Sequence, residues 1–367
     1  MTAPLTPLAA SLPTSVPFVG PETQERLQGF AFRARIGANE NMFGPSPKAV
    51  AAMAQAAAQA WMYGDPECFD LKAALAAHHR VAAEHVVVGE GIDGLLGLLV
   101  RLFVAPGDAV ATSAGAYPTF NFHVTGYGGV IHLAPYRGWH EDPQALLDLA
   151  RHSHAKLIYL ANPDNPMGSH HPAHAIEAMI EALPHGTLLV LDEAYIEFAP
   201  DGTAPRIAAD DPRVIRLRTF SKAYGLAGAR VGYAIAAAPL AQAFDKVRNH
   251  FGVGRVVQAA ALAALADPGH LDWLQGQITT ARARIAQIAM ANGLTALPSA
   301  TNFSCLDLGR DQAHAQRVLA ALREQGIFIR MPGVAPLDRC IRISLGDAAA
   351  MQAFALALPI ALQTAQR

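Results

Sequence analysis

The sequence predicts an α/β protein: a large domain with a mainly parallel seven-stranded sheet, then a smaller α+β domain. Between residues 85 and 236, short apolar runs with β-branched residues alternate with segments of helical pattern. This alternation is typical of a parallel sheet whose two faces are covered by helices. After residue 238, long alanine-rich helical stretches dominate. The length of 367 residues corresponds to roughly two domains.

The apolar runs give the strands of the large sheet. They cover residues 85–88, 108–112, 129–134, 156–160, 187–191, 213–217 and 230–236. The helices expected between them include 91–104, 117–127, 142–151 and 172–182. Further along, we expect helices at 255–266, 269–292, 312–325 and 347–363, and strands at 302–308, 327–330 and 340–344. The large domain is therefore placed at residues 39–254 and the small domain at 255–367.

The first 38 residues show no clear periodicity and contain several prolines between Pro4 and Pro21. Proline restricts its own backbone and that of the preceding residue, so residues 1–38 are predicted to form an irregular arm. The arm is either a disordered tail or a strap over a partner or an active site. Its first basic residue is Arg26, so it lacks the charged start of a signal peptide.

Charge and composition exclude several classes of function. The 28 basic and 30 acidic residues give a net charge of −2, too small for steering to nucleic acid. No uncharged apolar run reaches the ~18 residues of a membrane span. The cysteines, Cys68, Cys305 and Cys340, are widely spaced, which favours buried free thiols in a reducing compartment and no metal site. We expect a cytoplasmic protein without nucleic-acid or membrane partners.

A reactive lysine is predicted in RTFSKAYGLAGARVG, residues 218–232. Lys222 follows a buried strand and lies in a loop of small residues. Most lysines are solvated, but desolvation here would lower the pKa of the amine and free it as a nucleophile towards a carbonyl. The Ser221 hydroxyl and the Arg230 guanidinium would suit a phosphate beside it.

A buried acid is predicted in LLVLDEAYIEF, residues 188–198. Asp192 ends an apolar strand, and the carboxyl ends of strands line the ligand crevice in open α/β sheets. Tyr195 would project towards the same crevice. The alternative interpretation is that Asp192 caps a following turn.

Two further strand ends carry polar turns. In YLANPDNPMGS, residues 159–169, two prolines can fix the aim of the Asn165 amide, although an ordinary Asx/Pro turn is the simpler interpretation of this segment alone. In VVVGEGIDGLLGLL, residues 86–99, a glycine-rich turn opens a helix. A helix start offers N–H groups and a positive dipole end to a phosphate. The GxGxxG and Walker A patterns are absent, so a dinucleotide fold gets little support.

These four segments all fall at predicted strand ends, and together they indicate one cofactor. A reactive lysine, a buried acid, aromatic groups and a phosphate cradle are the groups that pyridoxal phosphate requires. The lysine would form a Schiff base with it. The acid would pair with the pyridinium nitrogen and keep it protonated as an electron sink.

The sequence resembles the fold-type I, class I/II pyridoxal-phosphate-dependent aminotransferases, most closely the histidinol-phosphate aminotransferase group. The resemblance extends from about residue 35 to 346. Its segments, in order, are ARIGANENMFGPSP, YGDPECFDLKAALA, GEGIDG, AYPTF, NPDNPMG, DEAYIEF, SKAYGLAGARVG and RISLG. The SK-x-x-x-L-x-G-x-R-x-G spacing after DEAY is highly specific. The resemblance implies an aspartate aminotransferase-like fold.

The resemblance also implies cofactor roles. Lys222 would carry the Schiff base and then shuttle the proton, and Asp192 would form a salt bridge with the pyridine nitrogen. Tyr195 and Asn165 would hydrogen-bond the phenolic oxygen, and Tyr117 would stack on the ring. The groups around the phosphate would be Ile92, Asp93, Ser221 and Arg230, the first two mainly through backbone N–H, and Gly91 would also belong to the cofactor site. Tyr63 would reach the phosphate of the neighbouring subunit, which implies a homodimer with shared active sites.

For the substrate, the resemblance implies two anion contacts. Arg342 would bind the α-carboxylate or a phosphate, and Arg330 would be the second contact. Asn39 and Glu40 would lie near the substrate mouth. The sequence departs from the family at four positions. Met42 replaces the usual Pro, and Met167 replaces the usual Thr. Gly94 replaces an acidic residue, and Phe18 replaces a Tyr.

The expected activity is transfer of an amino group from histidinol phosphate to 2-oxoglutarate by a ping-pong mechanism. The alternatives are another amino donor, aromatic or small, and a reaction like that of the threonine-phosphate decarboxylases. A pyridoxal-phosphate-binding regulator would need a DNA-binding module, but only 38 residues precede Asn39 and they show no basic helix-turn-helix pattern.

Overall fold

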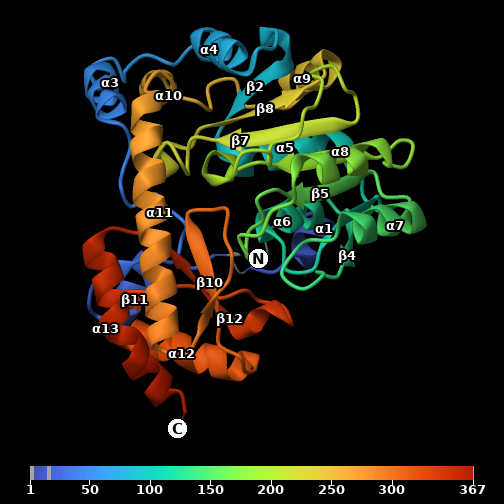
Figure 1. Cartoon of the computed structure of the whole chain (residues 1–367). Helices are drawn as coiled ribbons and strands as arrows, with labels where there is room; N and C mark the ends of the chain where they lie inside the picture. Colours follow the sequence, from blue (N-terminus) through green and yellow to red (C-terminus); the bar gives the residue numbers. More distant parts are fainter. Residues whose placement is uncertain (1–3, 15–17, 367) are drawn as a thin grey trace.

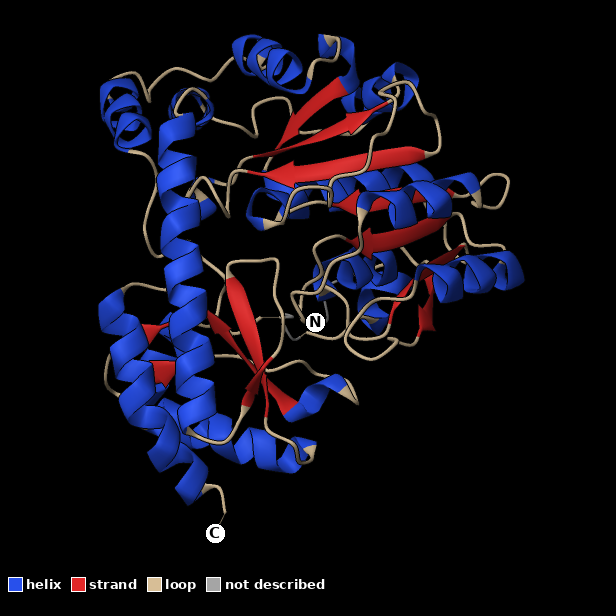
Figure 2. Cartoon of the chain, in the orientation of Figure 1, coloured by secondary structure: helices blue, strands red, loops and turns tan. Residues whose placement is uncertain are grey.

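A seven-stranded sheet forms the centre of the larger part of the molecule in the computed structural model, which describes residues 4–14 and 18–366 (Figures 1 and 2). The strand order is β2-β8-β7-β6-β5-β3-β4, and β8 alone runs antiparallel to its neighbours. The strands are β2 (Val86–Gly89), β3 (Ala109–Ser113), β4 (Val130–Ala134), β5 (Leu157–Ala161), β6 (Leu188–Asp192), β7 (Val214–Thr219) and β8 (Gly232–Ala236). The predicted α/β fold with a mainly parallel sheet is confirmed.

Alternating side chains of the central strands enter two different cores. Tyr159 and Val190 pack with helix α5 (Gly91–Phe103) and helix α6 (Pro118–Gly126). Ile158 and Leu191 point to the opposite face and pack with α7 (Pro143–Ser153) and α8 (Ala173–Glu181). Because strand side chains alternate between faces, a strand covered on both sides must be apolar throughout. This is why the sequence shows continuous apolar runs here.

The C-terminal part of the chain builds two small sheets under long helices. Strands β12 (Cys340–Ser344), β10 (Phe303–Asp307) and β9 (Thr295–Ala296) are antiparallel, whereas β1 (Ala34–Arg35) pairs in parallel with β11 (Ile327–Phe328). Figure 1 shows the long α11 running beside both parts of the molecule. The helices here are α10 (Arg255–Leu265), α11 (Pro268–Ala291), α12 (Gln312–Glu324) and α13 (Ala348–Thr364). The domain boundaries at 39 and 255 stay a prediction.

The N-terminal arm is more regular than expected. It contains α1 (Pro7–Ser11) and α2 (Pro21–Gln28), each with proline at the start of the helix. A first-turn proline costs no hydrogen bond because that N–H has no helical partner, so these prolines start helices rather than prevent them. The prediction of an irregular arm was wrong for these segments, while residues 1–3 and 15–17 lie outside the described part of the chain.

The remaining helices are α3 (Pro47–Ala57), α4 (Phe69–His79) and α9 (Ala238–Ala243). Over the described residues, no helix combines the length and the apolar character that crossing a bilayer requires. Cys68, Cys305 and Cys340 are free and buried, as predicted. Burial raises the pKa of the Cys68 thiol to about 11, so this side chain stays protonated.

A buried ion cluster ties β6 to β7 beside the site. Glu193 follows Asp192 and is fully buried, with its carboxylate held by Arg216 at 3.0 Å and Arg218 at 2.9 Å. Burial alone would raise the pKa of Glu193, but the charges and hydrogen bonds of the two arginines outweigh it and lower the pKa. The adjacent acids Asp192 and Glu193 thus have separate partners.

We expect Glu193→Ala to lower the free energy of unfolding by about 3–5 kcal/mol, because two arginines would lose their buried counter-charge. Glu181→Ala is the control, since the Glu181–Arg213 pair is exposed and such pairs contribute at most ~1 kcal/mol. Urea unfolding of both variants measures the difference. Equal losses in the two would contradict a structural role for the Glu193 cluster.

Candidate active site

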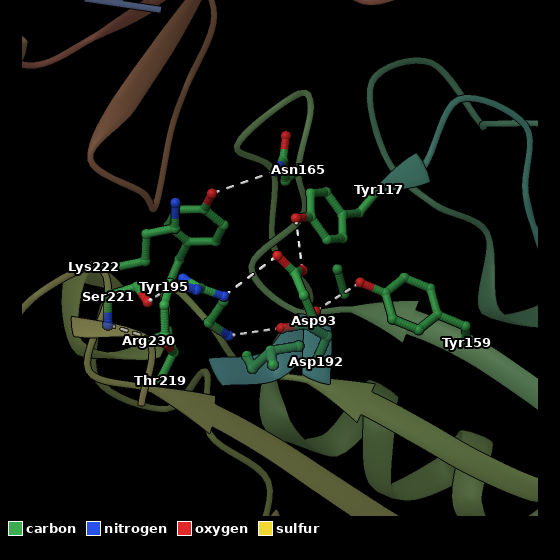
Figure 3. A pocket seen from close by; sticks show the side chains of 13 residues that line it. Asp93, Tyr117, Tyr159, Asn165, Asp192, Tyr195, Thr219, Ser221, Lys222 and Arg230 are labelled. Atoms are coloured by element: carbon green, nitrogen blue, oxygen red, sulfur yellow. Dashed lines mark hydrogen bonds and ion pairs between the residues drawn. The ribbon is translucent and has the colours of Figure 1, made fainter. Parts of the chain in front are cut away.

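Side chains from the ends of several strands meet in one cavity (Figure 3). Asp192 ends β6, Asn165 follows β5, and Lys222 follows β7. The predicted residues lining the cavity are Ile92, Asp93, Tyr117, Asn165, Asp192, Tyr195, Ser221, Lys222 and Arg230. Because the carboxyl ends of parallel strands share one edge of the sheet, residues far apart in sequence converge here.

Asp192 is a buried carboxylate with two hydrogen bonds. Its Oδ2 accepts from the Tyr159 hydroxyl at 2.7 Å, and its Oδ1 accepts from the Ala194 N–H at 2.9 Å. Burial raises the pKa of Asp192 to about 6, although both hydrogen bonds oppose the rise. A cationic group placed against this carboxylate would stabilise its charge.

Lys222 faces the same cavity with its amine available. Its Nζ donates to the Asn39 carbonyl at 3.2 Å and lies 5.5 Å from the centre of the Tyr195 ring. Among the described residues, no carboxylate forms an ion pair with this amine. Asn39 is held by Asn302, which donates to the same carbonyl at 3.1 Å, and by Ser344, which accepts from its N–H at 2.9 Å. The lysine is therefore positioned by neutral groups.

Two amides converge on the Tyr195 hydroxyl. It accepts from Asn39 Nδ2 at 3.1 Å and from Asn165 Nδ2 at 3.4 Å. Across the cavity, the Tyr117 hydroxyl donates to Asp93 Oδ1 at 2.8 Å. Burial, and then the Asp93 charge, raise the pKa of Tyr117, so this phenol stays neutral.

One end of the cavity is built for an anion. Arg230 donates weakly to Ser221 Oγ at 3.4 Å, and its Nη2 lies 3.5 Å from Asp93 Oδ2. Helix α5 starts beside it at Gly91, which has a positive φ of 76°. A Cβ on Gly91 would lie only 2.5 Å from Arg230 Nη2. The glycine lets the guanidinium and the helix start share one space, and both favour a phosphate.

A second pocket adjoins the first and contains two arginines, Arg330 and Arg342. Their backbones pair across an isolated bridge. Arg342 Nη1 donates to Asn165 Oδ1 at 2.5 Å, while Arg330 Nη2 donates to the Val19 carbonyl at 3.0 Å. Neither guanidinium has a carboxylate partner among the described residues. Burial and then the charge of Arg342 lower the pKa of Arg330, so an anion would relieve their repulsion.

The arm closes one side of this second pocket. Phe18 lies 6.0 Å from the Tyr117 ring and 5.0 Å from the Arg330 guanidinium, measured to ring centres. Of the two interpretations of the arm, its Phe18–Val19 segment fits the strap over a site.

Comparisons with known proteins identify the family. A sequence model described as aminotransferase class I and II matches residues 35–358. This chain belongs to the aminotransferase class I and II family. The resemblance inferred from the motifs is confirmed, and with it an enzyme of the aminotransferase type.

Relatives of this aminotransferase cover nearly its whole length. It is 38% identical to a histidinol-phosphate aminotransferase of Anaeromyxobacter sp. (strain Fw109-5), covering 93% of this chain and 94% of the relative. Among solved structures, the histidinol-phosphate aminotransferase of Sinorhizobium meliloti in complex with pyridoxal 5'-phosphate has a TM-score of 0.96 and 52% identity, covering 99% and 98% of the chains. A mutant Thermus thermophilus aspartate aminotransferase, 23% identical with a TM-score of 0.78 over 96% and 99%, shows the shared fold.

Three residues predicted for the site of this aminotransferase lie away from the cavity linings. Tyr63 is 76% exposed and packs against Phe251, with ring centres 4.6 Å apart. Glu40 is exposed. Gly91 adjoins Arg230 but does not line the cavity. The single chain therefore does not bring Tyr63 to its own site.

Sequence reasoning missed four of the residues that line the first cavity: Tyr159, Ala161, Ala194 and Thr219. Tyr159 lies inside an apolar run that predicts only a buried strand. A signal was present nonetheless, because Tyr159 is two residues before the end of β5 and faces the same side as the strand end. Thr219 ends β7 and lies two residues before Ser221, whose N–H donates to its hydroxyl at 3.0 Å.

Proposed function

We propose that this protein is a pyridoxal-phosphate-dependent aminotransferase that transfers the amino group of histidinol phosphate to 2-oxoglutarate. The observation that carries the proposal is the convergence of Lys222, Asp192 and Arg230 on one cavity. An amine, a buried carboxylate and an anion cradle match the three ends of this cofactor. The similarity to the Sinorhizobium meliloti enzyme, whose structure contains the cofactor, supports the assignment.

Pyridoxal phosphate, when bound, supplies a carbonyl that condenses with amines and a ring that withdraws electrons from the substrate Cα. Lys222 would attach to it through Nζ and, after release by the amino donor, move a proton at that atom. The Asp192 carboxylate would hold the proton on the ring nitrogen. Asn165 and Tyr195 would orient the phenolic oxygen, Tyr117 would cover the ring, and the phosphate would be held by Ile92, Asp93, Ser221 and Arg230, with Gly91 leaving room.

The substrate assignment depends on Arg330 and Arg342 together with the named relatives. Two guanidiniums without carboxylate partners suit an amino donor that carries a phosphate and a 2-oxo acid that carries carboxylates. Asn39 would position Lys222 next to the bound donor, and Glu40 would lie at the outer mouth. Phe18 offers a ring without a hydroxyl at this pocket, so the arginines would supply the anion contacts.

The proposal includes a homodimer with shared sites. Tyr63 packs against Phe251, and both rings are exposed. Trp61 and Phe69, which are close to Tyr63 in the sequence, are exposed as well. An exposed apolar cluster of this kind marks an interaction surface, and a second copy covering it would allow Tyr63 to reach the partner's phosphate. The free thiols fit a reducing cytoplasm.

The test is a two-step reaction with purified protein carrying pyridoxal phosphate. L-histidinol phosphate is added first and 2-oxoglutarate second, and the products are identified. A keto product from the first step and glutamate from the second are expected. If glutamate forms only with another amino acid, that amino acid replaces histidinol phosphate as the proposed donor. Release of CO2 would indicate a decarboxylase. No reaction with any donor would contradict the proposed function.

Gly91→Ala should weaken the affinity for pyridoxal phosphate by about tenfold or more, the equivalent of one charge-assisted hydrogen bond. The added Cβ displaces Arg230 and needs an unfavourable positive φ. Gly228→Ala is the matched control, because Gly228 lies in the loop that carries Arg230 and its Cβ would meet open space. Titration of the apoenzyme gives both affinities. Equal affinities would place the phosphate elsewhere.

Affinity for pyridoxal phosphate should also fall as the pH drops through about 6. The Asp192 carboxylate, whose pKa is raised to about 6, must be ionised to pair with the pyridinium. Below that pH it becomes neutral and the pairing is lost. The ratio of wild-type to Asp192→Asn affinity isolates this effect from titration of the phosphate. A ratio that does not change with pH would contradict it.

A further inference from the structure

Two carboxyl groups are buried together behind the loop that carries Asn165. Glu141, between β4 and α7, is 1% exposed, and Asp164, in the loop after β5, is 2% exposed. Neither forms a salt bridge among the described residues, and neither has a role in the reaction outlined above. A buried charge without a partner is costly, so these two groups need a physical explanation.

The hydrogen bonds of Glu141 and Asp164 indicate which of the two carboxyl groups carries a proton. Asp164 Oδ1 accepts from the Tyr136 hydroxyl at 2.9 Å, and Oδ2 accepts from the Met167 N–H at 3.1 Å. Glu141 Oε1 accepts from the Ala161 N–H at 3.0 Å, but Oε2 has no donor. The Glu141 side chain is within hydrogen-bonding reach of Asp164. Two carboxyl groups that share a hydrogen bond need a proton, and Glu141 Oε2, which has no other donor, is the atom free to carry it.

The surroundings favour this distribution. Burial, then the negative charge of Asp164, raise the pKa of Glu141; Ser113 and the Ala161 N–H oppose the rise, and Asp192 adds to it. The positive charge of Arg342 acts in the opposite direction on Asp164 and lowers its pKa. Tyr136 and Cys305 are the other titratable side chains nearby, and His171 contacts the Glu141 backbone carbonyl at 2.8 Å. Arg342 is therefore the cation that supports an ionised Asp164.

Asp164 is built into the turn that presents Asn165. Its N–H donates to the Ser169 carbonyl at 2.8 Å, and its carbonyl accepts from the Gly168 N–H at 3.1 Å. The next residue, Asn165, contacts Arg342 at 2.5 Å and Tyr195 at 3.4 Å. Any displacement of the Asp164 carboxylate would therefore be transmitted to both site contacts of Asn165.

We infer that Glu141 and Asp164 share one proton as a buried acid pair, and that this pair positions Asn165 and Arg342 for the amino donor. The inference rests on the proposed function for the role of Arg342. Loss of the shared proton would place two negative charges side by side and shift the turn. Glu141 acts through Asp164 and touches neither cofactor nor substrate.

Glu141→Gln is the informative variant. Its Nε2 can donate permanently to Asp164 while its Oε1 still accepts from Ala161, so it copies the protonated pair without a proton to lose. The holoenzyme is compared with this variant by infrared difference spectroscopy at neutral pH. We expect the carbonyl stretch of a protonated carboxylic acid in the wild type and its loss in Glu141→Gln. No difference between them overturns the shared proton, whatever reaction the enzyme catalyses.

Steady-state kinetics test the positioning role, with whichever amino donor the two-step reaction identifies. Glu141→Gln should stay within about threefold of the wild-type KM, whereas Glu141→Ala should raise KM by about tenfold with a smaller change in kcat. Equal KM values in all three overturn the role. If Glu141→Ala does not fold, the alkaline pH dependence decides. At alkaline pH the wild-type KM should rise above the KM of Glu141→Gln. If the ratio of these two KM values does not change with pH, the positioning role is overturned.

Discussion

The buried carboxylate of Asp192 is the constraint on which the rest of the site depends. It lies at the end of a strand packed on both faces, so no water shell stabilises its charge. Tyr159 and the Ala194 N–H supply two hydrogen bonds, and Lys222 supplies the cation whose charge favours ionisation. The neighbouring Glu193 forms ion pairs with Arg216 and Arg218, so these arginines do not pair with Asp192. Among the described residues Asp192 has no ion-pair partner, so its carboxylate is available to the protonated pyridine ring proposed above.

The adjoining pocket contains two guanidiniums, Arg330 and Arg342. Arg330 and Arg342 are held by carbonyl and amide oxygens instead of carboxylates. Neutral acceptors fix the direction of a guanidinium and leave its charge available. The first cavity thus contains the buried Asp192 carboxylate, the adjoining pocket contains two guanidiniums without carboxylate partners among the described residues, and Asn165 lines both.

The large sheet and most of the candidate site could be predicted because buried strands and functional side chains produce different sequence patterns. Central strands must be apolar on both faces, so β5 and β6 appear as continuous runs, and a polar residue that ends such a run, like Asp192, stands out. Tyr159 could not be recognised because its hydroxyl is hidden in an apolar run. Glu141 has no motif, since only the folded chain brings it to Asp164. The helices of the arm were missed because first-turn prolines resemble helix breakers.

The single antiparallel strand has a consequence for how the site is assembled. Since β8 runs back along β7, with Thr219 opposite Gly232, the loop between them leaves and re-enters the sheet at the same edge. Lys222 and Arg230 therefore belong to one short hairpin, closed by the bonds from Phe220 to Val231 and from Leu226 to Phe220. Their separation is set by local chain geometry. If the two parts of the molecule moved relative to each other, the proposed attachment point and the proposed phosphate anchor would therefore move together.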